Sequence, residues 1–237
     1  MGYIEKAIEE IKNYWFADHV AEIKGEEGLQ VIQWGKPGTN MYRTKYVLSG
    51  ANVFIAGDIG EAVYTLTCAA TPANIKGFNL SYFTGKLQAY CGERWNFDSK
   101  KARKELNEYW EEYDMSDQEE DSEDMRMKIL SAINESSSMS EYQYWLHDAY
   151  HTTSMDSDTI SDVSDFGKRL PYRLIGYWLG LQMAIEQLEK KQFNCDLCFQ
   201  NKNIEEKSIY QFDEDGDIVA CVDCEKKAFE ESKIQTK

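Results

Sequence analysis

Two Cys-x-x-Cys pairs constrain this chain more than any other feature: Cys195 with Cys198, and Cys221 with Cys224. Each pair can bend into a turn that points two thiolates at one ion, and two such turns complete the tetrahedron that Zn²⁺ prefers. Because four protein ligands leave no open coordination position, we expect a structural rather than a catalytic metal. The alternative interpretation is a set of redox-active pairs or free thiols. The pattern favours a zinc centre.

The segment around these cysteines is typical of a small zinc module. The 22 residues between the two pairs are long enough for a hairpin, with strand-like runs at 209–212 and 218–220 on either side of an Asp-Glu-Asp-Gly turn. Residues 226–232 are typical of a closing helix. We therefore predict a zinc-ribbon or treble-clef-like module over residues 193–237, in which structural Zn²⁺ supplies folding energy that so small a segment lacks.

Residues 1–192 are predicted to form one α+β domain. Its start has four apolar residues in a 4-3-4 spacing that places them on one helical face: Ile4, Ile8, Ile11 and Trp15. This predicts a helix through residue 24, ended by the glycines that follow. Three short runs of β-branched and aromatic residues, separated by turn residues, then predict a small antiparallel meander over residues 41–68.

A mostly helical region is expected over residues 80–191. Its candidate helices are 80–90, a stripe from Ala102 to Tyr113 capped by Asp98 or Ser99, 125–133, 142–150 and a longest helix over 174–188. Cys68 and Cys91 lie among apolar or aromatic residues, and we expect both in the core. The predicted fold class is α+β with a C-terminal four-cysteine module.

The charge balance narrows the possible partners. The chain has 26 Lys and Arg against 42 Asp and Glu, a formal net charge of −16. This argues against direct binding of nucleic acid or of anionic membranes, which both need a basic face. The N-terminus lacks the apolar core of a signal peptide, and no apolar run reaches the length of about 18 residues that a membrane span needs. We expect a cytoplasmic protein.

The acidic residues are concentrated in one run. Between Glu105 and Asp124 there are eleven Asp and Glu in twenty residues and no Lys or Arg. The simpler interpretation is a solvated helix face and a flexible loop; the alternative is a surface that presents carboxylates where DNA presents phosphates. The candidate partner-binding residues are Glu108, Glu111, Glu112, Asp117, Glu119, Glu120 and Asp121.

Other motifs give little support to catalysis. His147 and His151 have the four-residue spacing that can place two imidazoles on one metal, but no Glu follows the first His as a zinc hydrolase requires. We interpret both as partly buried side chains beside Trp145 and Tyr150.

The Gly-Asp-Ile-Gly segment 57–60 is interpreted as a tight turn. Phosphate-cradling loops, nucleophile elbows and dinucleotide fingerprints are missing from the sequence. No catalytic residues are predicted, and we do not expect an enzyme.

Part of the chain resembles a family of phage and prophage proteins. Residues 46–64 read Tyr-Val-Leu-Ser-Gly-Ala-Asn-Val-Phe-Ile-Ala-Gly-Asp-Ile-Gly-Glu-Ala-Val-Tyr, and residues 81–86 read Ser-Tyr-Phe-Thr-Gly-Lys. This is similar to a pattern in uncharacterised phage proteins: a strand, a Gly-Asp-x-Gly turn, a second strand and a Tyr-Phe-x-x-Lys segment. The resemblance includes neither the acidic run nor the zinc module. It implies a phage accessory protein, such as an anti-CRISPR or other anti-defence protein, and no catalytic residues.

These expectations combine into one functional hypothesis. The protein is predicted to inhibit a nucleic-acid-targeting defence complex, a Cas nuclease or similar effector, by protein–protein binding in the host bacterial cytoplasm. Its acidic run would face the Lys and Arg of the effector's nucleic-acid channel. The alternatives are a zinc-ribbon adaptor in phage transcription or replication, and a metal-dependent hydrolase that uses His147 and His151.

Overall fold

The computed structural model describes residues 2–113, 122–195, 197–198, 200–213 and 216–227. The chain divides into two compact units, residues 1–89 with 176–237 and residues 90–175. Helices and strands occur in both units, so the α+β fold class is confirmed. The domain boundary predicted between residues 192 and 193 lies inside the first unit.

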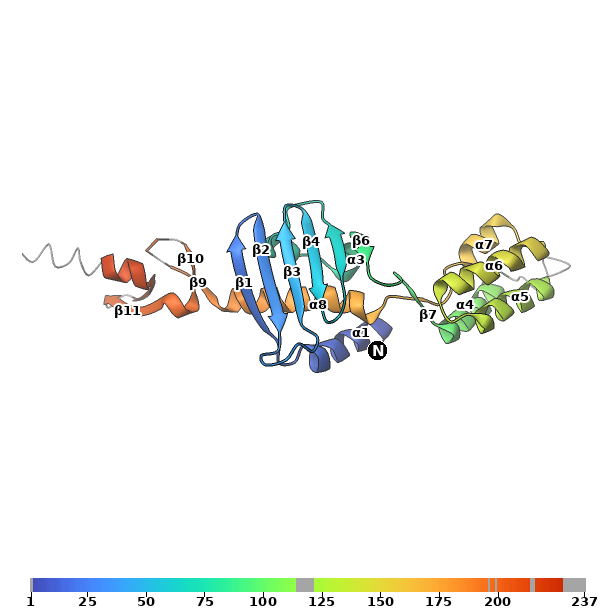
Figure 1. Cartoon of the computed structure of the whole chain (residues 1–237), viewed down its shortest axis with the longest axis horizontal. Helices are drawn as coiled ribbons and strands as arrows, with labels where there is room; N and C mark the ends of the chain where they lie inside the picture. Colours follow the sequence, from blue (N-terminus) through green and yellow to red (C-terminus); the bar gives the residue numbers. More distant parts are fainter. Residues whose placement is uncertain (1, 114–121, 196, 199, 214–215, 228–237) are drawn as a thin grey trace, which may run out of the picture. The chain divides into compact units, whose positions relative to one another are not determined.

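The first unit is built on a six-stranded sheet whose strands follow one another in sequence order (Figure 1). The strands are β1 (Val20–Glu26), β2 (Leu29–Gly35), β3 (Thr44–Ser49), β4 (Asn52–Gly57), β5 (Ala62–Thr65) and β6 (Leu87–Tyr90). The first five form an antiparallel meander. Two short helices, α2 (Pro72–Ile75) and α3 (Leu80–Gly85), connect β5 to β6.

One face of this sheet forms the core of the first unit. In β3, Thr44 and Tyr46 are buried and alternate with residues that point to the other face, as the two-residue period of a strand requires. The long helix α8 (Tyr172–Lys190) packs on the buried face. Its Gly180 approaches the Tyr46 hydroxyl so closely that a Cβ atom there would lie 2.5 Å from the oxygen. The Tyr177 hydroxyl donates to the carbonyl of Ile59 at 3.1 Å.

The N-terminal segment differs from its prediction after residue 15. Helix α1 (Tyr3–Glu10) continues as one turn of π-helix, η1 (Ile11–Trp15), in which the Phe16 N–H donates to the carbonyl of Ile11 at 3.0 Å. The predicted helix through residue 24 is wrong, because Val20–Glu26 forms β1 instead. Strand β1 pairs along its whole length with β2, and this pairing decides its conformation.

The predicted meander over residues 41–68 is confirmed as strands β3, β4 and β5, but the sheet is larger than expected. Strands β1, β2 and β6 extend it at both edges. The helix expected over residues 80–90 is only half correct, because α3 ends at Gly85 and the chain continues as β6. The Gly-Asp-Ile-Gly segment 57–60 forms the predicted turn between β4 and β5, where the Gly60 N–H donates to the carbonyl of Gly57 at 3.1 Å.

The second unit is mainly helical. It contains β7 (Asn96–Phe97), α4 (Ser99–Glu112), α5 (Ser122–Glu135), α6 (Met139–Thr152), α7 (Ser157–Val163) and β8 (Lys168–Arg169). Asp98 caps α4 as predicted, because its carboxylate accepts the Lys101 N–H at 2.8 Å. The helices share a core that includes Leu106, Trp110, Met125, Ile129, Tyr142, Leu146 and Val163. Burial raises the pKa of Tyr142, so its hydroxyl stays protonated and donates to the Val163 carbonyl at 2.9 Å.

The helices that the structure describes include no candidate membrane span. None of them combines the length with the apolar character that crossing a bilayer requires.

Candidate metal centre

The four cysteines predicted to bind zinc come together in the structure. The sulfur atoms of Cys195, Cys198, Cys221 and Cys224 all lie within 4.8 Å of one another. In a tetrahedral zinc–thiolate centre with bonds of about 2.3 Å, the sulfur atoms are about 3.8 Å apart. The side chains therefore need to move inward only slightly to bind an ion. Among the described residues, this is the one group of three or more His, Cys, Asp or Glu side chains with such an arrangement.

Two hairpins present these cysteines. The first pairs β9 (Gln192–Asn194) with β10 (Asn201–Asn203), and Cys195 and Cys198 lie in the turn between them. The second pairs β11 (Lys207–Asp213) with β12 (Gly216–Cys221), so that Cys221 is the last residue of a strand. A helical segment over 222–227 follows at once and holds Cys224. A 3₁₀ turn at Ile204–Glu206 connects the two hairpins.

Backbone N–H groups favour a thiolate at the first cysteine. The Cys221 N–H donates to the Cys195 sulfur at 3.2 Å. Burial of the thiol opposes ionisation, but N–H groups of Cys198, Cys221 and Leu197 stabilise the anion and together lower the pKa of Cys195 to about 6. By contrast, hydrogen bonding to Cys221 and the other sulfurs raises the pKa of Cys224. Four thiols this close cannot all ionise without a cation, and a divalent metal ion supplies that charge.

The module has a very small apolar core in the part of it that the structure describes. Its buried cluster consists of Cys195, Ala220 and Cys221, with Cys198 and Cys224 partly buried against it. The cysteines are therefore both the candidate ligands and most of the described interior. Such a cluster gives little hydrophobic stabilisation, so the stability of the module depends on what the thiolates bind.

The structure places only three of the seven predicted partner-binding acids. Glu108, Glu111 and Glu112 lie on the last two turns of α4 with exposed side chains. Glu108 forms an ion pair with Lys104, one turn earlier, at 3.0 Å. The other four predicted residues, Asp117, Glu119, Glu120 and Asp121, lie outside the described residues.

Some acidic residues within this run and beyond it have structural roles instead. Glu105 pairs with Lys101 at 3.0 Å and accepts the Gly167 N–H at 2.8 Å, which joins α4 to the start of β8. Asp156 caps α7 through the Thr159 N–H at 2.7 Å, and this hydrogen bond lowers the pKa of Asp156. The sequence alone did not separate these carboxylates from those that face solvent.

Two expectations about individual side chains are wrong. His147 and His151 are exposed rather than partly buried, and their Nε2 atoms lie 3.2 Å apart. No third His, Cys or carboxylate among the described residues joins them in a ligand group. Cys91 was expected in the core but is exposed, and Cys68 is only partly buried. Cys68 lies in the connection between β5 and α2, and Cys91 directly follows β6. In such segments apolar neighbours in the sequence do not imply burial.

Comparisons with known proteins give no further constraint on this centre. Protein-family models, curated protein sequences and solved structures all yield no match to this chain. The interpretation of the site therefore depends on its own geometry and chemistry.

Proposed function

We propose that the chain binds one Zn²⁺ through Cys195, Cys198, Cys221 and Cys224, and that this ion is structural. The observation that carries the proposal is the convergence of four sulfur atoms within 4.8 Å. The first cysteine pair lies in a turn between two strands. The second pair lies at the end of a strand and in the helical segment that follows it. This order of elements supports a treble-clef-like module. Thiolates select soft or borderline metals, and four of them without an open position suit structural zinc.

Metal analysis of the full chain tests this proposal. Protein purified without added metal is expected to contain one zinc per chain, and a thiol-reactive mercurial is expected to release it in a single step. Lowering the pH should also release zinc, because protons compete with the metal for four thiolates. Iron at one equivalent would contradict the choice of metal, since four thiolates also bind iron. Metal-free protein with two disulfides would contradict the metal centre itself.

We further propose that the protein is a non-enzymatic inhibitor that binds a bacterial nucleic-acid-targeting defence effector in the cytoplasm, as the phage resemblance suggests. Exposed Glu108, Glu111 and Glu112 on α4 support this role, since they lie on a helix whose other face is anchored in a core of its own. The net charge of −16 would steer the protein toward a basic channel and increase the association rate. A rigid helix can hold carboxylates at fixed spacing against Lys and Arg of a partner.

A charge-reversal variant tests the binding surface. The triple substitution Glu108→Lys, Glu111→Lys and Glu112→Lys is expected to abolish co-purification with the effector from infected-cell lysate and to restore its nucleic-acid binding. Each side chain is exposed, so the fold should be retained. The measurement is a pull-down from nuclease-treated lysate, with circular dichroism as a check on folding.

The chain offers a matched control for this variant. Glu5, Glu9 and Glu10 are also exposed acids on a helix, α1, and their replacement by Lys changes the net charge by the same amount. The α1 variant is expected to bind the effector. Equal loss in both variants would mean that total charge rather than the α4 surface drives association. Binding by the α4 variant would contradict the mimicry, and recovery of transcription or replication proteins instead would favour the zinc-ribbon adaptor.

A further inference from the structure

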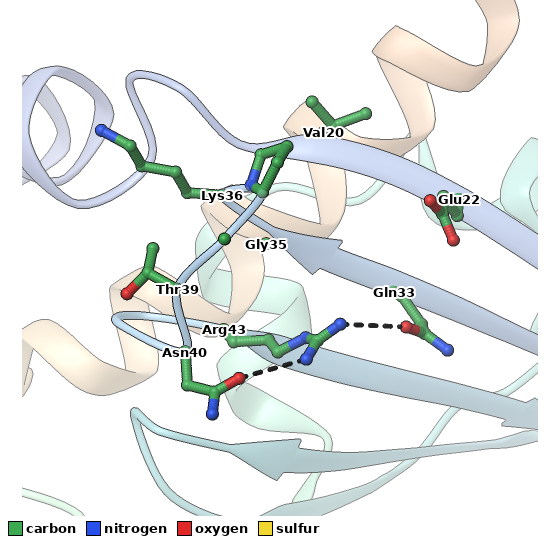
Figure 2. A pocket seen from close by; sticks show the side chains of 10 residues that line it. Val20, Glu22, Gln33, Gly35, Lys36, Thr39, Asn40 and Arg43 are labelled. Atoms are coloured by element: carbon green, nitrogen blue, oxygen red, sulfur yellow. Dashed lines mark hydrogen bonds between the residues drawn. The ribbon is translucent and has the colours of Figure 1, made fainter.

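Two adjoining hollows lie beside the β2–β3 connection of the first unit, and Arg43 lies between them. One has a volume of about 420 Å³ and includes Val20, Pro37 and Lys36 in its lining. The other has a volume of about 480 Å³ and includes Lys45. Gln33, Asn40 and Arg43 line both hollows. Figure 2 shows the Arg43 guanidinium extended between Asn40 and Gln33 within the first of them.

The hydrogen bonds of Arg43 make this region rich in donors. Its guanidinium donates to Asn40 Oδ1 at 3.1 Å and, over a longer distance of 3.5 Å, to Gln33 Oε1. Both amide oxygens thereby accept from the guanidinium, and the NH₂ group of each amide has no hydrogen-bond partner among the described residues. Arg43 has no carboxylate partner among the described residues, because both of its hydrogen-bond acceptors are neutral. Its positive charge is therefore left for a ligand to neutralise.

Strand geometry adds a second cation on the same face. Arg43 directly precedes β3, and Lys45 is two residues further along, so the two side chains point to the same side of the sheet. Gln33 is the β2 partner of Lys45 in the register, which brings its amide to the same row. Lys45 is exposed and forms no ion pair within the described part of the chain. Two cations and two amides thus line one hollow.

Two carboxylates also line the hollows, Glu22 the first and Asp58 the second, and neither forms an ion pair with Arg43 or Lys45 in the described part of the chain. Asp58 Oδ2 accepts the Tyr42 N–H at 2.7 Å, and the Asp58 N–H donates to the carbonyl of Arg43 at 2.8 Å. Asp58 therefore fixes the backbone on both sides of the peptide between Tyr42 and Arg43. In the first hollow Lys36 pairs with Asp18 at 2.7 Å, which leaves Arg43 and Lys45 as the cations available to an anion.

The backbone before Arg43 is held in a strained conformation. Tyr42 has φ of +56°, in the left-handed region that bulky side chains rarely adopt, at a cost of about 1–3 kcal/mol. Its carbonyl accepts His19 Nε2–H at 3.2 Å, and its ring stacks on Trp15 with centroids 5.0 Å apart. Burial lowers the pKa of His19, which keeps this imidazole neutral.

Two irregularities of the backbone therefore meet next to the hollows. Trp15 ends the π-helix η1, and π-helical turns are frequent at functional sites. Tyr42 is the one non-glycine residue with positive φ among those described, and such strain is concentrated at ligand-binding positions. Together they fix the chain from which Arg43 extends. A preorganised guanidinium loses less conformational entropy when it binds an anion.

We propose that Arg43 and Lys45 bind the phosphate group of a phosphorylated small molecule of nucleotide size. A phosphate offers three terminal oxygens and close to two negative charges, which suits a guanidinium, an ammonium and two amide NH₂ groups better than a carboxylate does. The remainder of the molecule would extend into the first hollow, along Pro37 and Val20. A small ligand fits the charge of the chain, since a net charge of −16 repels a nucleic-acid polyanion.

Calorimetric titration of the full chain with three probes tests this site: inorganic phosphate, adenosine monophosphate and acetate. Adenosine monophosphate is expected to bind with one site per chain, inorganic phosphate more weakly, and acetate not measurably. Arg43→Gln is expected to weaken nucleotide binding by roughly tenfold or more, since it removes a charge-assisted hydrogen bond. Lys45→Gln should also weaken nucleotide binding.

Lys24→Gln is the matched control, because Lys24 is an exposed lysine on β1 of the same sheet and its loss changes the net charge equally. It is expected to leave binding unchanged. The proposal is overturned by the absence of saturable phosphate or nucleotide binding at millimolar concentrations. It is also overturned by binding that Arg43→Gln and Lys24→Gln weaken equally, and by tighter binding of acetate than of phosphate.

Discussion

Replacing Cys221 with serine is expected to release the zinc and to unfold the two hairpins that hold the cysteines, while the second unit keeps its structure. Cys221 is 2% exposed, ends β12 and donates its N–H to the Cys195 sulfur. Structural zinc contributes an apparent binding free energy of about 10–16 kcal/mol in zinc-finger peptides, and a serine hydroxyl is a poor replacement for a thiolate ligand. Among the described residues little apolar surface is buried around the cysteines, so in that part of the module a bound metal is the main source of stability.

The measurement combines zinc content with hydrogen exchange. In the Cys221→Ser variant the amides of β11 and β12 should exchange rapidly, whereas those of α5 and α6 should keep their protection. Cys91→Ser is the matched control, because it makes the same chemical change at an exposed cysteine outside the cluster. It should retain one zinc and full protection. A Cys221→Ser protein with undiminished zinc would contradict four-cysteine ligation.

The four-cysteine cluster was the part of the structure most accessible from the sequence, because each of its pairs is close together in the sequence. Cys-x-x-Cys spacing fixes two ligands within one turn, so the pairing of Cys195 with Cys198 needs no knowledge of the fold. The cap at Asp98 is local in the same way. The runs that became β3, β4 and β5 are rich in β-branched and aromatic residues and are joined by short turns, so their pairing is also nearly local.

The errors occur where distant partners decide the outcome. Strand β1 has only Ala21 and Ile23 for its core face, its other residues are exposed, and it is a strand because β2 pairs with it. The group of hydrogen-bond donors around Arg43 also depends on contacts that the local sequence does not reveal. It depends on Gln33 from strand β2 and on the left-handed Tyr42, a residue type that does not favour this conformation. No sequence pattern indicates such a convergence.

Replacing Gly57 with alanine is expected to destabilise the first unit by about 3 kcal/mol or more. A Cβ atom at this position would lie 2.1 Å from the carbonyl oxygen of Arg43 and 2.9 Å from the Cα atom of Thr44, and φ is +157°. The conflict is with backbone, which cannot rotate away as a side chain can. Gly57 is the register partner of Thr44, and the same Arg43 carbonyl accepts the Asp58 N–H. Overpacking and an unfavourable φ then add together.

The Gly28→Ala variant separates these two contributions. Gly28 also has a positive φ, +95°, but a Cβ atom there would have no neighbour within 4 Å, so this variant reports only the conformational cost of about 1–2 kcal/mol. Urea unfolding, together with hydrogen exchange of the β3 and β4 amides, should give Gly57→Ala a clearly lower free energy of unfolding than Gly28→Ala. Equal stability of the two variants would contradict the close approach of the β4 end to Arg43. Because the same contact fixes Arg43, Gly57→Ala should also weaken nucleotide binding while Gly28→Ala leaves it intact, and this result would link the end of β4 to the proposed anion site.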